Sequence, residues 1–210
     1  MPREPNSPGH WIKRWDGSPI DEILVYLTTC SCFMKVTLLQ RRLNVQPFDR
    51  VNSNITIECR RVPYYLAFTV DEVIKHVVGA VPHSLADIEG IEFVFLCRNR
   101  SAPTASMDAT TIDYLLWRSL IISYRERTQT LFQKAFSDPP AEVNFLRALR
   151  NAFSHDGRVK QETVTDKAVW RNLHLGSHVG EIVYPTLLMP GDLLLLLYDV
   201  DQLLRAKLGA

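Results

Sequence analysis

The sequence predicts a mainly α-helical fold: an antiparallel helical bundle preceded by an N-terminal extension that can include short strands. Three observations predict the bundle. Residues 108–136 contain no glycine or proline and carry apolar residues at helical spacing. Residues 141–155 follow a pair of prolines, repeat apolar residues every three or four positions, and stop before Gly157, which is a natural left-handed terminator. A further helical pattern opens on proline and covers 190–208.

These patterns divide the chain into three parts. Residues 1–19 are rich in proline and glycine and are expected to be irregular. Residues 20–106 form a mixed N-terminal extension, and residues 107–210 form the bundle. Within the bundle, residues 169–184 are expected to be a loop with short extended pieces.

The N-terminal extension carries patterns of both kinds of secondary structure. Local signals predict, in order, a helix over 20–43, a strand at 55–59, a helix over 68–81 capped by Thr69, and a loop over 98–106. Residues 91–97 form a short apolar run, and periodicity does not decide between a buried strand and a helix there.

Composition points to a cytoplasmic protein that buries a sizeable core. Hydrophobic residues make up 46% of the chain and charged residues 22%, and the net charge is only +1. Any affinity for nucleic acid must therefore come from a local basic patch. The apolar runs are too short or too interrupted to span a bilayer, so no membrane partner is expected. The four cysteines lack paired zinc spacing, which favours reduced thiols.

The helix at 141–155 carries the residues with the clearest chemical potential. On a helical wheel its apolar side chains fall in one sector: Phe145, Leu146, Leu149, Ala152 and Phe153. Its polar side chains fall in the opposite sector: Asn144, Arg147, Arg150, Asn151, Ser154 and His155. The polar sector is not needed for the core, so it is available to a substrate or a second subunit.

Two of these polar residues suit chemistry on phosphate. The guanidinium of Arg150 can bind a phosphate, and the imidazole of His155 can move protons near neutral pH. A simpler interpretation stays open: His155 would only complement the helix dipole and cap carbonyls, and the arginines would only form a solvated face.

The segment Arg150-Asn151-Ala-Phe-Ser-His155 resembles the Arg-x(4–6)-His signature of the HEPN superfamily, including the polar residue directly after the arginine. The resemblance covers roughly residues 108–208 and implies an up-and-down helical bundle. It also implies a homodimer in which the signature helices meet at the two-fold axis. The implied activity is metal-independent endoribonuclease cleavage, often in a toxin or an anti-phage effector. Family members that are silenced by nucleotidyl transfer carry a tyrosine where this chain has Gly157.

The resemblance implies a catalytic role for Arg150, Asn151 and His155, and it places the substrate beside them. The flanking polar residues are expected to bind the substrate: Arg147, Ser154, Arg158, Lys160 and Glu126. Residues 124–127 of the preceding helix are expected to face the same cleft. There Glu126 would order Arg150, unless it only forms a salt bridge within its own helix.

The expected partners are an RNA substrate, a second copy of the chain and an inhibitory protein that restrains cleavage. No metal or other cofactor is expected. His174 and His178 have a spacing that can bind a metal on a helix, but neighbouring glycines oppose a helix there and no third ligand is evident. Two rival functions remain: a non-catalytic HEPN-like module that binds a nucleotide or a partner, and a helical interaction domain with a chance motif.

Overall fold

The computed structural model describes residues 10–27, 29, 54–69, 90–97 and 110–210. The fold is mainly helical, as predicted. Its labelled helices are α3 (Thr110–Arg127), α4 (Gln129–Ala135), α5 (Ala141–Ser154) and α6 (Pro190–Leu208), and residues 20–27 and 29 are also helical. Its strands are β1 (His10–Lys13), β2 (Asn54–Glu58), β3 (Tyr64–Thr69), β4 (Gly90–Cys97), β5 (Val169–Trp170) and β6 (Leu173–His174). Short helical turns lie at Gln161–Thr163, Leu175–His178 and Val183–Leu187.

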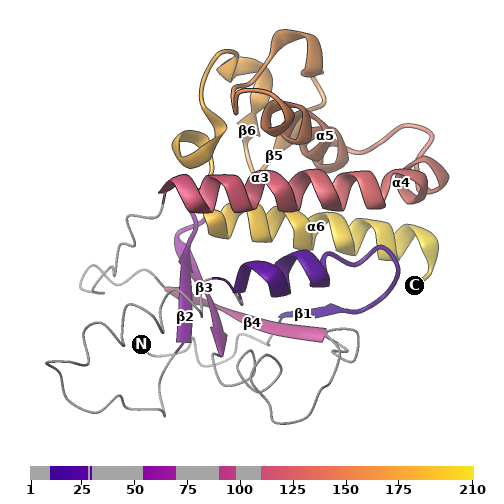
Figure 1. The fold of residues 1–210 in the computed structure, drawn as a ribbon. Coiled ribbons are helices and arrows are strands. Elements are labelled where there is room, and N and C mark those ends of the chain that lie inside the picture. Colours follow the sequence, from indigo (N-terminus) through magenta and orange to yellow (C-terminus); the bar gives the residue numbers. More distant parts are fainter. Residues whose placement is uncertain (1–9, 28, 30–53, 70–89, 98–109) are drawn as a thin grey trace, which may run out of the picture.

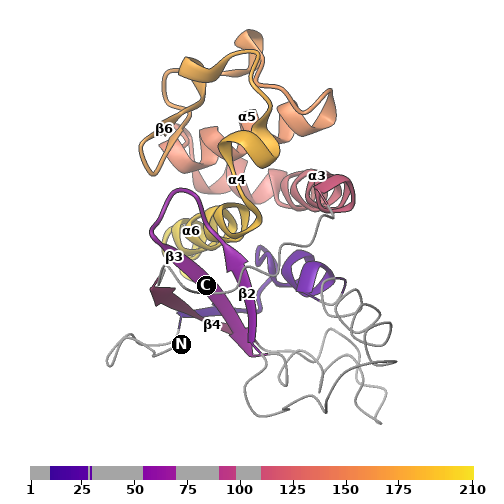
Figure 2. The ribbon, with the colours of Figure 1, turned by 90° about the vertical axis from the view of Figure 1, so that its left-hand side faces the viewer.

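Helices α3 and α6 lie side by side and point the same way, with α5 on one side of the pair and the larger sheet on the other (Figure 1). Figure 2 shows α3 and α6 close to end-on, with the sheet below α6 and α5 above. Helix α5 is antiparallel to α3, because Arg150 pairs with Glu126 late in α3 and Gly157 lies against Tyr114 near its start. Residues 20–27 are also antiparallel to α3, because Glu22 contacts Arg127 and Tyr26 stacks on Trp117.

The larger sheet is antiparallel in the order β1-β4-β3-β2. Strand β2 confirms the strand predicted at 55–59, and β4 decides for a strand at 91–97. Strand β1 lies in the stretch expected to be irregular, where Ile12 pairs with Ile91. Phe68 and Thr69 end strand β3, where they pair with β2, so the predicted helix does not begin at residue 68; the rest of that helix and its capping by Thr69 lie outside the described residues.

The described residues leave out residues 30–43 of the first predicted helix, residues 70–81 of the second, and the whole of the loop predicted over 98–106. The expected boundary at residue 107 also lies outside the described residues, so the division into parts stays a prediction. Buried residues from both sides of that boundary nevertheless belong to one hydrophobic cluster, which includes Ile12, Leu24 and Leu66 together with α3, α5 and α6.

The long helix predicted over 108–136 is interrupted at Thr128, and its expected cap Asp108 lies outside the described residues. Thr128 has φ −95° and ψ 4°, and its buried hydroxyl donates to the carbonyl of Tyr124 at 2.6 Å. This threonine back-bond competes with regular helix geometry, so α3 and α4 are two segments. The absence of glycine and proline could not reveal the break.

Helix α6 is the centre of the core. Five consecutive leucines, Leu193–Leu197, are at most 2% exposed. A helix that is apolar on every side must be covered on every side. Here α3, α4, α5 and β2 all contact α6, so the helix joins the elements of both halves of the chain.

The first turn of α6 holds the sheet through a buried carboxylate, that of Asp192. Both its oxygens accept from the backbone N–H of Arg60 at 2.8–2.9 Å, and Oδ1 also accepts from the N–H of Arg61 at 2.8 Å. Oδ2 accepts from the N–H of Met189 at 2.8 Å, which caps the helix. The turn between β2 and β3 is thereby fixed to the start of α6.

We expect Asp192→Ala to lower the free energy of unfolding by about 3 kcal/mol, because it removes the acceptor of three backbone N–H groups that are partly buried, those of Arg60, Arg61 and Met189. Chemical denaturation at pH 7 measures the loss. The matched control is Asp166→Ala at an exposed position, expected to change stability by no more than about 0.5 kcal/mol. Equal stability of the two variants would contradict the role assigned to Asp192.

A second buried carboxylate fixes the N-terminal segment to the other end of α6. The indole N–H of Trp15 donates to Oδ1 of Asp201 at 2.6 Å. Burial raises the pKa of Asp201 to about 6, although the hydrogen bond from Trp15 and the charge of Arg205 both favour the ionised form. Because the folded protein holds this proton more tightly than the unfolded chain, ionisation of Asp201 opposes folding.

The contribution of Asp201 to stability should therefore decrease as pH rises from about 4 to about 6 and stay constant above that. Asp201→Asn keeps an acceptor for Trp15 and removes the titration. Its free energy of unfolding relative to the unmodified protein should rise over this range by up to about 3 kcal/mol. Denaturant unfolding between pH 4 and pH 7.5 tests this, and parallel stability profiles for the two proteins would refute it.

Candidate functional site

Helix α5 buries the apolar stripe that the sequence predicts. Its five members are at most 1% exposed: Phe145, Leu146, Leu149, Ala152 and Phe153. Asn144, however, was expected on the polar face and is instead 6% exposed. Its amide donates to the carbonyls of Pro139 and Pro140 at 2.7 and 3.2 Å, so it ties down the entry to the helix.

The C-terminal end of α5 is a defined turn. His155 is the first residue beyond the helix, and Gly157 has φ +76°, as its position after the helix predicts. The N–H groups of His155 and Gly157 both donate to the carbonyl of Ala152, at 3.2 and 3.0 Å. The carbonyl of Gly157 then accepts from the N–H of Val183 at 2.9 Å, which fixes the chain that leaves the site.

Tyr114 of α3 closes this turn from the neighbouring helix. A Cβ placed on Gly157 would lie 2.7 Å from the Tyr114 hydroxyl oxygen, and the Tyr114 ring lies 5.9 Å from that of Phe153, centroid to centroid. Sequence reasoning missed Tyr114, because nothing in the spacing within α3 shows which of its residues meets the end of α5.

Arg150 is held in place by two neighbours. Its Nη2 donates to Glu126 of α3, and its Nη1 donates to the side-chain oxygen of Asn151 at 3.2 Å. The Arg150 side chain remains 34% exposed, so the guanidinium is oriented without being sealed. Glu126 thus orders Arg150 across helices, which was one of the two expected alternatives.

The imidazole of His155 is exposed at the end of the same helix. No hydrogen bond from this ring to another described residue is present. Ser154, one position earlier, donates its hydroxyl to the carbonyl of Arg150 at 2.9 Å. The Ser154 hydroxyl hydrogen is therefore already used within the helix, while His155 is an exposed residue whose ring is not bonded to any described residue.

Two more predicted residues flank the turn. Arg158 is exposed, and its Nη1 donates to the carbonyl of Gly180 at 2.8 Å. Its backbone N–H donates to Asp156, which lowers the pKa of that carboxyl. Lys160 is half-buried on the same strand-like segment, whose neighbour Val159 pairs with Glu181 and Gly180.

The expectation that residues 124–127 face one cleft is only half right. Tyr124 is fully buried, and Arg127 turns to the N-terminal segment, where it pairs with Glu22. The other two residues, Arg125 and Glu126, lie towards α5. The pKa of Arg125 is lowered mainly by burial, and the positive charges of Arg147 and Arg150 lower it further. Adjacent helix positions point in directions about 100° apart, so one run of four residues cannot share a face.

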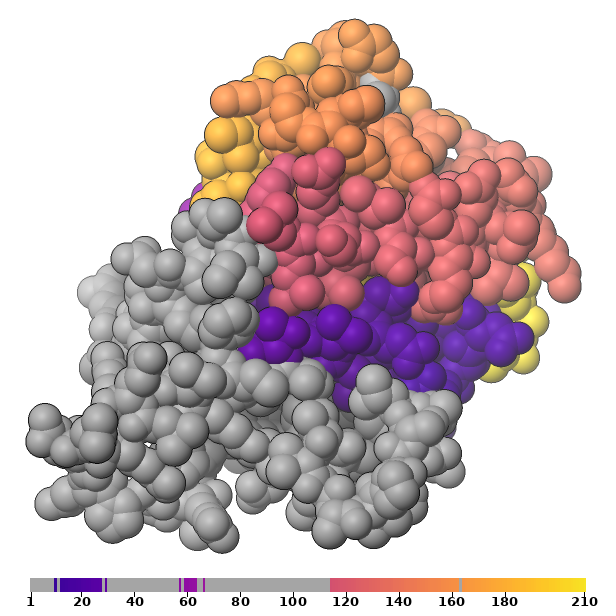
Figure 3. Space-filling model, in the orientation of Figure 1, coloured from indigo at the N-terminus to yellow at the C-terminus, as the bar shows by residue number. Residues whose placement is uncertain are grey.

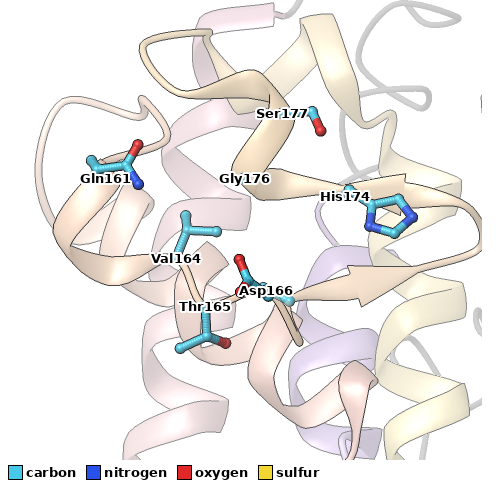
Figure 4. Close-up of a pocket in the computed structure, with 8 residues that line it drawn as sticks. Gln161, Val164, Thr165, Asp166, His174, Gly176 and Ser177 are labelled. Atoms are coloured by element: carbon cyan, nitrogen blue, oxygen red, sulfur yellow. The ribbon is translucent and has the colours of Figure 1, made fainter.

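A separate polar pocket of about 340 Å³ lies in the segment that follows the turn (Figure 4). Residues from 161–168 face residues from 174–177 across it, with Asp166, His174 and Ser177 among its lining. No hydrogen bond joins these three residues, so they form no nucleophile–base pair.

The two histidines with metal-like spacing have different surroundings. His174 lines the pocket, while Nδ1 of His178 lies 3.0 Å from Glu181. Across the part of the chain that the structure describes, no three residues of the types His, Cys, Asp and Glu gather as a metal site.

Comparison with known proteins gives no matching family model, no matching curated protein and no matching solved structure. The resemblance to HEPN proteins therefore depends on the residues of the Arg150–His155 segment alone. Among the described helices, none is both long enough and apolar enough to cross a membrane.

The turn that presents His155 can be tested at Gly157. We expect Gly157→Ala to lower the free energy of unfolding by about 3 kcal/mol, because the left-handed backbone and the Tyr114 hydroxyl both oppose a Cβ. Gly180→Ala is the matched control: its φ is +86° and nothing lies within 4 Å, so only about 1 kcal/mol should be lost.

Adding Tyr114→Phe to Gly157→Ala removes the atom nearest to the new Cβ and should recover part of the loss. Equal destabilisation by the two alanine substitutions would show that Tyr114 does not constrain the turn. Thermal and denaturant unfolding of the three variants provide the comparison.

Proposed function

We propose that this protein is a metal-independent endoribonuclease of the HEPN type, in which Arg150, Asn151 and His155 carry out the reaction. One observation supports this most directly: α5 presents an oriented, partly exposed guanidinium about one turn before its end, and an exposed imidazole directly follows the same helix. The first suits a phosphate and the second suits proton transfer near pH 7.

In the proposed reaction, His155 removes the proton of the RNA 2′-hydroxyl, and the resulting oxygen attacks the adjacent phosphorus. The bond to the 5′-oxygen of the next nucleotide breaks, and that oxygen takes up a proton. Arg150 stabilises the added negative charge on the phosphorus oxygens, and Asn151 orients Arg150 or a phosphate oxygen. The products are a 2′,3′-cyclic phosphate end and a 5′-hydroxyl end.

One histidine does not readily act as base and acid in the same step. A homodimer that brings together the ends of two α5 helices supplies a second His155, so we include the dimer in the proposal. Arg147, Ser154, Arg158, Lys160 and Glu126 would surround the RNA. In the cell the enzyme would act in the cytoplasm as a toxin or an anti-phage effector, restrained by an inhibitory partner protein.

A non-catalytic module that binds a nucleotide or a partner is the second candidate. The ion pair between Arg150 and Glu126 favours a module without catalysis, because the carboxylate already neutralises the guanidinium that would stabilise the transition state. The two candidates differ in one measurable respect, which is whether the purified protein cuts RNA.

We expect His155→Ala and Arg150→Ala each to reduce RNA cleavage by at least about 100-fold, because each removes a group that acts in the transition state. His174→Ala, which removes another exposed histidine, is the matched control and should cleave normally. Cleavage should continue in excess EDTA and leave 2′,3′-cyclic phosphate ends. These ends are detected because they lack a free 3′-hydroxyl, so an adaptor cannot be ligated to them directly. Sedimentation should show a dimer.

Undiminished cleavage by His155→Ala would disprove the catalytic assignment. Failure of the unmodified protein to cut any RNA, with nucleotide binding that Arg150→Ala abolishes, would establish the non-catalytic module instead.

A further inference from the structure

Three arginines from two helices gather beside the proposed site. Arg147 and Arg150 lie three positions apart on α5 and therefore share one face of that helix. Arg125 precedes Glu126 on α3, and Glu126 binds Arg150 across the helix boundary. The positive charges of Arg147 and Arg150 are both close enough to lower the pKa of Arg125.

The cluster is short of negative charge. Glu126 is the carboxylate that pairs with Arg150, and neither Arg125 nor Arg147 forms an ion pair with any described residue. The Arg125 guanidinium carbon lies 4.8 Å from the centre of the Phe132 ring, and its buried Nε has no hydrogen-bond partner. Three guanidiniums thus share one carboxylate, and an anion bound among them would relieve their mutual repulsion.

The surrounding surface can admit such an anion. Arg147 is exposed, and Arg125 is only half-buried. Figure 3 shows one side of α3 open to solvent, between the N-terminal helical residues and the segment that contains α5. Guanidinium groups bind phosphate oxygens through paired N–H donors, so phosphate is the anion that the cluster suits best.

We infer that Arg125 and Arg147 form, next to Arg150, a subsite for a flanking phosphate of a single-stranded RNA, and that Glu126 competes with RNA phosphate for Arg150. The RNA identity of the ligand rests on the proposed function. His155 directly follows α5, and Arg147 lies about two turns before it, so the bound strand would run from His155 along α5 towards the seam with α3.

Glu126 then has a defined effect on binding. In the absence of RNA it neutralises and orients Arg150. A phosphate that binds Arg150 must displace this carboxylate or accept its repulsion, so Glu126 weakens RNA binding while it keeps the empty site ordered. Neutralising Glu126 should strengthen binding, whereas neutralising Arg147 or Arg125 should weaken it.

The test uses a single-stranded RNA with 2′-O-methyl groups at every position, which binds but has no nucleophile and is not cut. Affinity is measured over a salt series for the unmodified protein and for Arg147→Gln, Arg125→Gln, Glu126→Gln and Lys13→Gln. Lys13 is exposed on β1, on the opposite side of α3 and α6 from α5, and serves as the charge-matched control.

Arg147→Gln should weaken binding about tenfold at low salt and reduce the slope of log affinity against log salt by about 0.7, the value for one phosphate contact with a single strand. Arg125→Gln should act in the same direction, and Glu126→Gln should strengthen binding. Lys13→Gln should match the unmodified protein. Because Arg147 is exposed, its variant should keep the fold even if Arg125→Gln does not.

An unchanged salt slope in Arg147→Gln, weaker binding by Glu126→Gln, or no binding of the modified RNA by the unmodified protein would each overturn the subsite. Cleavage of ordinary RNA is scored separately. If these binding changes occur without cleavage of ordinary RNA, the nuclease proposal fails and the subsite stands. If ordinary RNA is cleaved but the salt slope is unaltered, the subsite fails and the nuclease proposal stands.

Discussion

The burial of Leu193–Leu197, which covers every side of the first half of α6, is the constraint on which the rest of this structure depends. These leucines need cover from α3, α4, α5 and the sheet at once, and the two buried carboxylates of α6 attach elements from the N-terminal half. Asp192 holds the β2–β3 turn, and Asp201 holds Trp15. Helix α5 packs on both α6 and α3. The positions of Arg150, Asn151 and His155 therefore depend on how the other elements pack around α6.

The part of the site that lies within one helix could be predicted, because helical period alone decides which α5 residues share a face. Arg150, Asn151 and His155 are accessible, and the stripe opposite them is buried. Asn144 departs from the pattern because a short amide in the first turn can reach backbone carbonyls that the wheel ignores. Tyr114 and Arg125 depend on how α3 and α5 meet, which spacing along either helix does not encode.

The same distinction holds for the fold. Helices α5 and α6 and strand β2 follow from local pattern and stop signals. The break at Thr128 depends on whether its hydroxyl bonds to a backbone carbonyl or to water. Thr69 lies in a strand because it pairs with β2. The local sequence predicts only that Asp192 lies at the start of a helix. Its bonds to Arg60 and Arg61, more than a hundred positions away, belong to tertiary structure that no local signal carries.

The bond between Trp15 and Asp201 joins residues 186 positions apart. A ribosome makes the chain from the N-terminal end, so Trp15 is made 186 residues before its acceptor Asp201. Until then, α6 is not available to pack against the apolar side chains of β1 and residues 20–27. Strand β1 and residues 20–27 should therefore reach their final packing late, together with α6.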